Sequence, residues 1–141
     1  MSVTEQALTD RDYVALAEFR HAIRSFQAFS EERAAAVGLT PQQHQALLAI
    51  RAAGPENATI GYVAERLILK PHSATGLIDR VESLGLVTRQ PSAEDRRRYV
   101  LQLTEKAYDI LAALSAIHRE EIRRLRPLLL EIFDAIGEDD R

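Results

Sequence analysis

Residues 59–103 read TIGYVAERLILKPHSATGLIDRVESLGLVTRQPSAEDRRRYVLQL, and their pattern is the strongest indication of the fold. Apolar residues at helical spacing predict a short helix over 62–67 and a second helix that opens at Pro71 and stops at Gly85. Two short helices joined by a tight turn are the layout of a helix-turn-helix. The residues expected to face inward are Val63, Ala64 and Leu67 in the first helix and Ala74, Leu77, Ile78, Val81 and Leu84 in the second.

The second helix carries a polar face opposite its apolar one. Ser73 and Thr75 have hydroxyls that can donate or accept hydrogen bonds at base edges, and Gly76 lets a helix backbone come close to a groove. By itself, this pair of helices is equally compatible with an ordinary helical hairpin whose polar face is solvated. The polar face consists of His72, Ser73, Thr75, Gly76, Asp79 and Arg80.

A β-hairpin is predicted directly after the second helix. Residues 86–90 have strand character, 91–95 are rich in turn formers, and 98–103 alternate as a half-buried strand does. A hairpin in this place is the wing of a winged helix, and its tip reads Glu94-Asp-Arg-Arg-Arg98. Three consecutive arginines usually mark only a solvated loop. Beside a candidate recognition helix they indicate nucleic acid, because the flat arginine charge suits a narrow minor groove.

Long apolar helices flank this core on both sides, over 10–38 and 104–138. They are too apolar for arms that face solvent, so we expect them to be dimerisation helices in which each chain covers the other's apolar stripe. Pro127 is expected to break or restart the second of them. The stripes consist of Leu16, Phe19, Ile23, Phe26 and Phe29 in the first helix and Ala107, Leu111, Leu114, His118, Ile122 and Leu125 in the second.

The core itself begins with a strong helix start. Thr40 is placed as the N-cap, Pro41 as the first helical residue, and Gln43 as the residue that completes a capping box. The sequence therefore predicts a mainly α (α+β) fold in a single domain over 1–141, with a winged helix-turn-helix core over 40–103.

Composition excludes several classes of protein. The chain has 141 residues, a formal net charge of -3 and no cysteine, which fits one domain and excludes disulfides, thiolate zinc sites and thiol redox sensing. The acidic total at first argues against a nucleic-acid partner. However, residues 60–103 hold seven basic and five acidic side chains, so the predicted winged helix is the basic part of the chain.

No feature of the sequence indicates an enzyme or a membrane protein. It contains no glycine-rich phosphate loop, no nucleophile elbow and no paired carboxylates in a histidine-bearing motif, so we expect neither catalysis nor a cofactor. The first residues have no basic region followed by an apolar run, and no apolar run approaches the ~18 residues of a spanning helix. We therefore expect a cytoplasmic protein with no membrane partner.

The four histidines do not predict a metal site. His21, His44, His72 and His118 are far apart, form no pair at ligand spacing, and have no thiolates to assist them. His118 lies on an apolar stripe, which favours a core or interface histidine over a ligand or pH sensor.

Six cationic and aromatic side chains could line a pocket for a small aromatic or anionic effector. Surface charge and ordinary packing are the simpler explanation for them. The candidate ligand-binding residues are Arg20, His21, Arg24, Tyr62, Tyr99 and His118.

Several motifs in a fixed order carry a resemblance to a known family. They are Leu39-Thr-Pro-Gln42, Val63-Ala-Glu-Arg-Leu67, Leu77-Ile-Asp-Arg-Val-Glu82, Gly85-Leu-Val87, and Asp95-Arg-Arg97 followed by Val100-Leu-Gln-Leu-Thr104. Over nearly its full length the chain resembles the MarR family of bacterial and archaeal transcriptional regulators. The ordered set of motifs is specific, although no single one is.

The resemblance implies a homodimer bound to a pseudo-palindromic operator, usually repressing transcription and released by a small, often aromatic or phenolic ligand. It implies that Asp95 braces the wing by pairing with an arginine, and that Arg96 and Arg97 reach the minor groove or its phosphates. Lys70 departs from the pattern, since it stands at an N-cap and cannot accept a hydrogen bond. The implied contacts of the recognition helix are Lys70, Pro71, His72, Ser73, Thr75, Gly76 and Arg80.

Two other functions stay open at this point. One is a winged-helix module that binds protein and never DNA, although such a module would not need three arginines at its tip. The other is a DNA binder that responds to no ligand.

Overall fold

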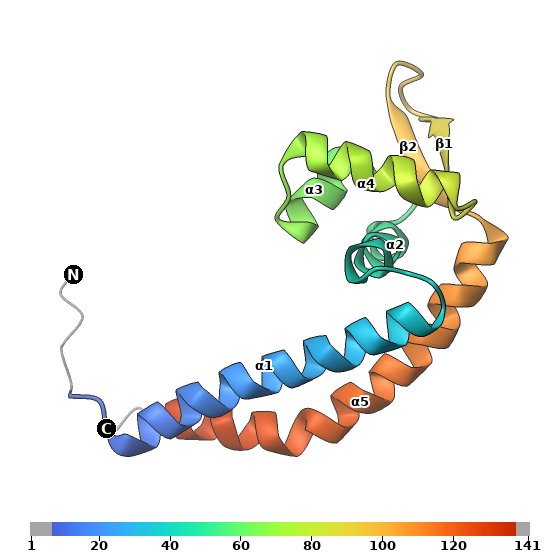
Figure 1. Ribbon diagram of the computed structural model, residues 1–141. Coiled ribbons are helices and arrows are strands. Elements are labelled where there is room, and N and C mark those ends of the chain that lie inside the picture. The colour runs from blue at the N-terminus through green and yellow to red at the C-terminus, as the bar shows by residue number, and fades with distance from the viewer. Residues whose placement is uncertain (1–6, 138–141) are drawn as a thin grey trace. The chain divides into compact units, whose positions relative to one another are not determined.

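The computed structural model describes residues 7–137, which are mostly helical with one small antiparallel sheet (Figure 1). The predicted fold class, a winged helix-turn-helix between long terminal helices, is confirmed. The elements in chain order are α1 (Asp10–Ala36), α2 (Pro41–Ala53), α3 (Ile60–Leu67), α4 (Pro71–Ser83), β1 (Val87–Pro91), β2 (Tyr99–Leu103) and α5 (Glu105–Gly137).

The chain forms two compact units. The winged-helix unit is Glu31–Ala116, and the helical unit is Met1–Ser30 with Ile117–Arg141. Residues 1–6 and 138–141 lie outside the described part of the chain. Both ends of the predicted domain over 1–141, and the last residue of the predicted helix over 104–138, fall on them.

The core of the winged-helix unit lies where the apolar spacing predicts it. Leu47 of α2, Val63 of α3 and Leu77 of α4 are fully buried, and both strands and the start of α5 contribute to the same cluster. One prediction is wrong, because Leu84 is 42% exposed. The helix ends at Ser83, so Leu84 is its C-cap and the helical spacing no longer directs that side chain inward.

Local hydrogen bonds explain where α2 and α3 begin. The Thr40 hydroxyl accepts a bond from the Gln43 backbone N–H, and the Thr40 N–H donates to the Gln43 side chain, both at 3.1 Å. This is the predicted capping box. The Thr59 hydroxyl likewise accepts from the Tyr62 N–H at 3.1 Å, so α3 starts at Ile60 rather than at residue 62.

The turn between α3 and α4 holds a β-branched residue in left-handed backbone. Ile68 has φ 55° and ψ 52°, and its side chain is 92% exposed. We expect Ile68→Gly to raise the free energy of unfolding by about 1 kcal/mol, since glycine relieves the left-handed cost but adds entropy to the unfolded chain. Urea denaturation measures this. Ile68→Val keeps the β-branch and is the control, and a glycine variant no more stable than the valine variant would refute the strain.

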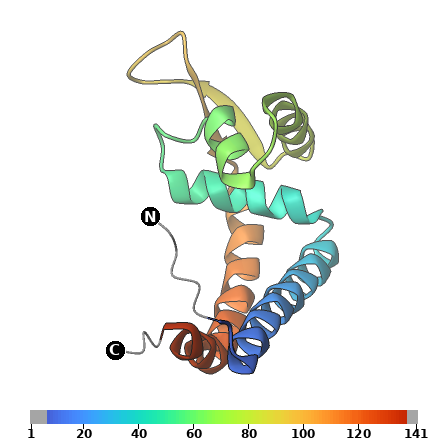
Figure 2. The same cartoon turned by 90° about the vertical axis from the view of Figure 1, so that its left-hand side faces the viewer.

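The wing is a two-stranded antiparallel ribbon. Its register pairs Val87 with Leu103 and Gln90 with Val100, and the segment between the strands extends away from them as a long loop (Figure 2). Buried and exposed side chains do not alternate strictly along β2, because Val100 and Leu101 are both buried. At the tip of the wing, Arg96 and its neighbours are exposed.

The helical unit pairs segments of α1 and α5 that lie side by side (Figures 1 and 2). His118 is 9% exposed, its Nε2 lies 2.8 Å from Ser30 Oγ, and its ring meets Phe26 and Phe29 edge-on with centroids 5.9 and 5.5 Å away. This agrees with a core histidine that has a hydrogen-bond partner. None of the described helices combines the length and apolarity needed to cross a membrane.

The predicted break at Pro127 is wrong, because α5 continues through it to Gly137. Proline removes only its own N–H donor, and the turns on either side keep theirs. The turn before it is supported by Arg123 and Arg124, which donate to Glu120 and Glu121 at 2.8 and 2.6 Å. The bond from Arg124 lowers the pKa of the Glu121 carboxyl.

Candidate nucleic-acid interface

The polar face of α4 lies on the surface, opposite a face that fills the core. His72, Thr75 and Arg80 are exposed and Ser73 is half-buried, whereas Ala74 and its apolar neighbours are buried. The same helix therefore anchors the fold with one side and presents small polar groups with the other. Pro71 and Lys70, at its start, are exposed as well.

Gly76 has no packing reason to be glycine. A Cβ at this position would meet only Arg80 Nη1, at 3.9 Å, which is an ordinary contact. Glycine within a helix costs about 0.5–1 kcal/mol relative to alanine. Nothing within the described part of the chain requires glycine at position 76. A glycine there is suited to a binding partner that approaches the helix backbone closely.

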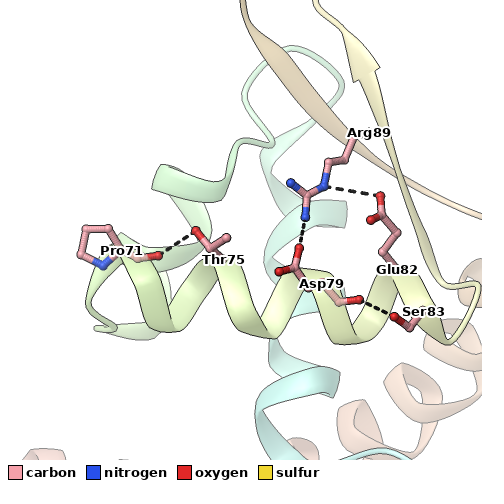
Figure 3. A network of polar contacts seen from close by, with 6 residues as sticks. All are labelled: Pro71, Thr75, Asp79, Glu82, Ser83 and Arg89. Carbon is pink, nitrogen blue, oxygen red and sulfur yellow. Dashed lines mark hydrogen bonds and ion pairs between the residues drawn. The ribbon is translucent and has the colours of Figure 1, made fainter.

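The Thr75 hydroxyl has a defined orientation. It donates to the Pro71 carbonyl at 3.1 Å, as Figure 3 shows, so its lone pairs are left to accept from outside. At the start of the helix, Lys70 occupies the N-cap and makes no side-chain capping bond, as its chemistry predicts. Its ammonium group is available at the end of the helix where anions are favoured.

The wing tip combines exposed cations with one internal brace. The Asp95 carboxylate accepts from the Arg97 backbone N–H at 3.0 Å and from Arg97 Nε at 3.4 Å. The Arg97 side chain is nevertheless 93% exposed, because the brace holds only its Nε end. Asp95 thus pairs with a neighbouring arginine, as the resemblance implied, and Arg96 is exposed beside the pair.

Arg89 joins the wing to α4, a role that its position in the sequence does not predict. From β1 it reaches two carboxylates on α4, donating from Nη2 to Asp79 and lying with Nε 3.4 Å from Glu82 Oε2 (Figure 3). The sequence contained one signal for this contact. Asp79 and Glu82 are three positions apart and share one helix face, where a cation would stabilise both carboxylates. Through this contact, the hairpin and α4 form one surface.

The six candidate ligand residues are distributed over both units. Arg20, His21 and Arg24 are exposed on α1, and His21 Nε2 lies 3.4 Å from Ser25 Oγ. Tyr62 is half-buried on α3, and His118 is buried within the helical unit.

One of the six lines a cavity. Tyr99 borders a space of about 390 Å³ together with Ile60, Arg89 and Leu101. A second cavity of about 360 Å³, which the sequence did not suggest, lies beside the end of α2, where Arg51 stacks 4.7 Å over the Tyr108 ring. Over residues 7–137, no cluster of three or more histidine, aspartate and glutamate side chains is arranged to hold a metal ion.

One protein family matches the winged-helix part of the chain. The sequence profile described as MarR family matches residues 37–98. Among curated relatives, the HTH-type transcriptional repressor MdtR of Bacillus subtilis (strain 168) is 33% identical over 84 residues, covering 57% of this chain and 53% of the relative. The chain spans about half the length of the curated relatives it matches.

Solved structures match nearly the whole chain. A MarR family protein from Bacillus stearothermophilus is 22% identical with a TM-score of 0.71, covering 94% of this chain and 100% of its own. A mutant of MepR from S. aureus, bound to an oligodeoxyribonucleotide, is 19% identical with a TM-score of 0.66, covering 92% and 99%. At these identities the likeness is one of fold.

The matched relatives are regulators of transcription and not enzymes, in agreement with the lack of catalytic motifs. The motifs that carried the resemblance fall largely within the matched residues. Residues 37–98 of this chain, which include α2, α3, α4 and β1 of the winged helix-turn-helix, match the MarR family.

Proposed function

We propose that this chain is a homodimeric regulator of transcription that binds a pseudo-palindromic DNA operator, represses from it, and leaves it when a small ligand binds. One observation carries the DNA-binding part: the polar face of α4 and the arginine wing tip belong to one unit, and Arg89 joins the hairpin that carries the tip to α4. Such a regulator acts in the cytoplasm and needs no cofactor.

In this proposal α4 enters the major groove. Ser73 and Thr75 face base edges, with the Thr75 lone pairs accepting from exocyclic amino groups, and Gly76 allows the close approach. Cationic and polar groups around them contact bases or the phosphates. These surrounding residues are Lys70, Pro71, His72 and Arg80.

The wing then contacts the adjacent minor groove or its phosphates. Arg96 and Arg97 supply the positive charge, and Asp95 limits the conformations of Arg97 before DNA is bound. The complex of the MepR mutant with an oligodeoxyribonucleotide supports this use of the fold.

The apolar surface of the helical unit supports a homodimer. In a single chain part of the predicted stripes stays open to solvent, with Leu16 48%, Ile23 41% and Ile122 52% exposed. Within the second stripe, Ala107, Leu111, Leu114 and His118 are buried within the chain itself. A second copy could cover the exposed part in a two-fold arrangement. Phe19 of the first stripe is also exposed, and further large apolar side chains exposed in this unit include Val14, Leu130, Phe133 and Ile136.

Repression and ligand release are each proposed on a separate observation. The relative MdtR is named a repressor. For the ligand, a small aromatic or anionic compound suits the candidate cationic and aromatic side chains, which are Arg20, His21, Arg24, Tyr62, Tyr99 and His118.

Footprinting on the DNA that flanks its own gene tests the proposal. We expect protection of two related half-sites whose centres lie about 10 base pairs, one helical turn, apart. Protection of a single half-site would contradict the two-fold arrangement, and an intact protein that protects no DNA would favour the protein-binding module. Repeating the experiment with phenolic carboxylates tests release, and protection that never changes would point to a DNA binder without a ligand.

A further inference from the structure

The base of the wing is held by a side chain from the loop between α2 and α3. There the Glu56 carboxylate accepts a hydrogen bond from Ser92 Oγ at 2.7 Å with one oxygen and from the Ala93 backbone N–H at 3.4 Å with the other. The Glu56 carbonyl accepts from Arg98 Nη2 at 3.5 Å. Glu56 therefore contacts both ends of the wing tip across 36 to 42 residues of sequence.

Ser92 connects this contact to the tip. It is only 2% exposed, its N–H donates to the Arg98 carbonyl at 2.7 Å, and its Oγ accepts from the backbone N–H groups of Glu94 and Asp95 at 3.2 and 3.3 Å. A serine hydroxyl has one proton to donate and two lone pairs. When the proton goes to Glu56, both lone pairs are directed to the backbone that presents Asp95 and, through it, Arg97.

We propose that Glu56 is a positioning residue for DNA binding: acting through Ser92, it sets the wing tip in the conformation from which Arg96 and Arg97 reach DNA. This rests on the proposed function. Glu56 itself does not contact DNA in this scheme. Its negative charge would by itself weaken binding to a polyanion, so the two possible roles predict opposite signs.

Operator binding by the full-length chain, measured by fluorescence anisotropy over a range of salt, separates these roles. Glu56→Ala removes both acceptors and should weaken binding roughly fivefold to tenfold, while Glu56→Gln keeps one acceptor oxygen and should lose less. Glu65→Ala is the matched control, since it removes the same charge from an exposed site on α3. We expect the control to bind as tightly as the parent or tighter.

A double variant tests the route. If Glu56 acts through the wing, Glu56→Ala combined with Arg97→Ala should lose less affinity than the sum of the two single losses, because the contact of Arg97 is lost in either case. Additive losses would overturn the proposal. So would a Glu56→Ala variant that binds like Glu65→Ala.

A measurement without DNA keeps the proposal distinguishable from the proposed function. Trypsin cleaves after arginine, so loss of the Glu56 contacts should speed cleavage at Arg96 and Arg97 in the free protein, with an unchanged thermal unfolding midpoint confirming that the fold persists. Equal cleavage rates in parent and variant would refute positioning of the wing. A parent protein that binds no operator would instead refute the proposed function.

Discussion

Arg97→Ala is expected to weaken operator binding by about 1–3 kcal/mol, or roughly fivefold to 150-fold, without disturbing the proposed dimer. The reason is geometric as well as electrostatic. The Asp95 carboxylate accepts a hydrogen bond from Arg97 Nε. The Arg97 side chain is otherwise exposed, which leaves it accessible for the proposed contact with the minor groove or a phosphate. Anisotropy titrations should also show the salt dependence, as a log–log slope, reduced by about one.

The control for this variant is Arg123→Ala. It removes an identical charge from an exposed side chain on α5, where Arg123 pairs with Glu120 at 2.8 Å. Its expected affinity is that of the parent. If Arg97→Ala bound the operator as tightly as this control at moderate salt, the assignment of the wing to DNA would fail.

Leu77→Ala is expected to lower the free energy of unfolding by about 3 kcal/mol, the range found for large apolar side chains truncated in a core. Leu77 is 1% exposed and lies in the cluster that α2, α3, α4 and both strands share. Equilibrium urea denaturation measures the loss.

Leu84→Ala makes the same chemical change at the end of the same helix. Because Leu84 is 42% exposed, we expect its truncation to cost less than about 1 kcal/mol. Equal losses for the two variants would mean that the inward face of α4 is assigned wrongly.

The helices and strands of the winged-helix unit could largely be predicted from sequence. The Thr40 capping box acts within a few residues and is found where it was expected. The second strand is also found where it was expected, although Val100 and Leu101 are both buried and its side chains do not alternate strictly. The errors arose where a local rule competes with its surroundings. Pro127 does not interrupt α5, and Leu84 lies just beyond the helix whose spacing placed it inside.

The sequence predicted the residues of the candidate interface. It did not predict the side chains that hold the wing against α4. His72, Ser73, Thr75 and Gly76 stand on the outer face of α4, and their roles toward DNA stay predictions. Arg89 escaped notice, because its partners on α4 are adjacent only once the hairpin folds back. The candidate ligand-binding residues were predicted from the chemistry of their side chains alone. Of the six, Tyr99 lines the cavity of about 390 Å³.

The order of the elements, the apolar side of each helix and the basic character of the winged helix can be predicted from the sequence, because caps, turns and periodicity depend on residues within one or two turns. The contacts that hold the wing could not be predicted in this way. Glu56 meets Ser92 across 36 residues, and Arg89 meets Asp79 across ten. Such contacts depend on where separate elements come to lie and on the directions of single side chains, which no local pattern specifies.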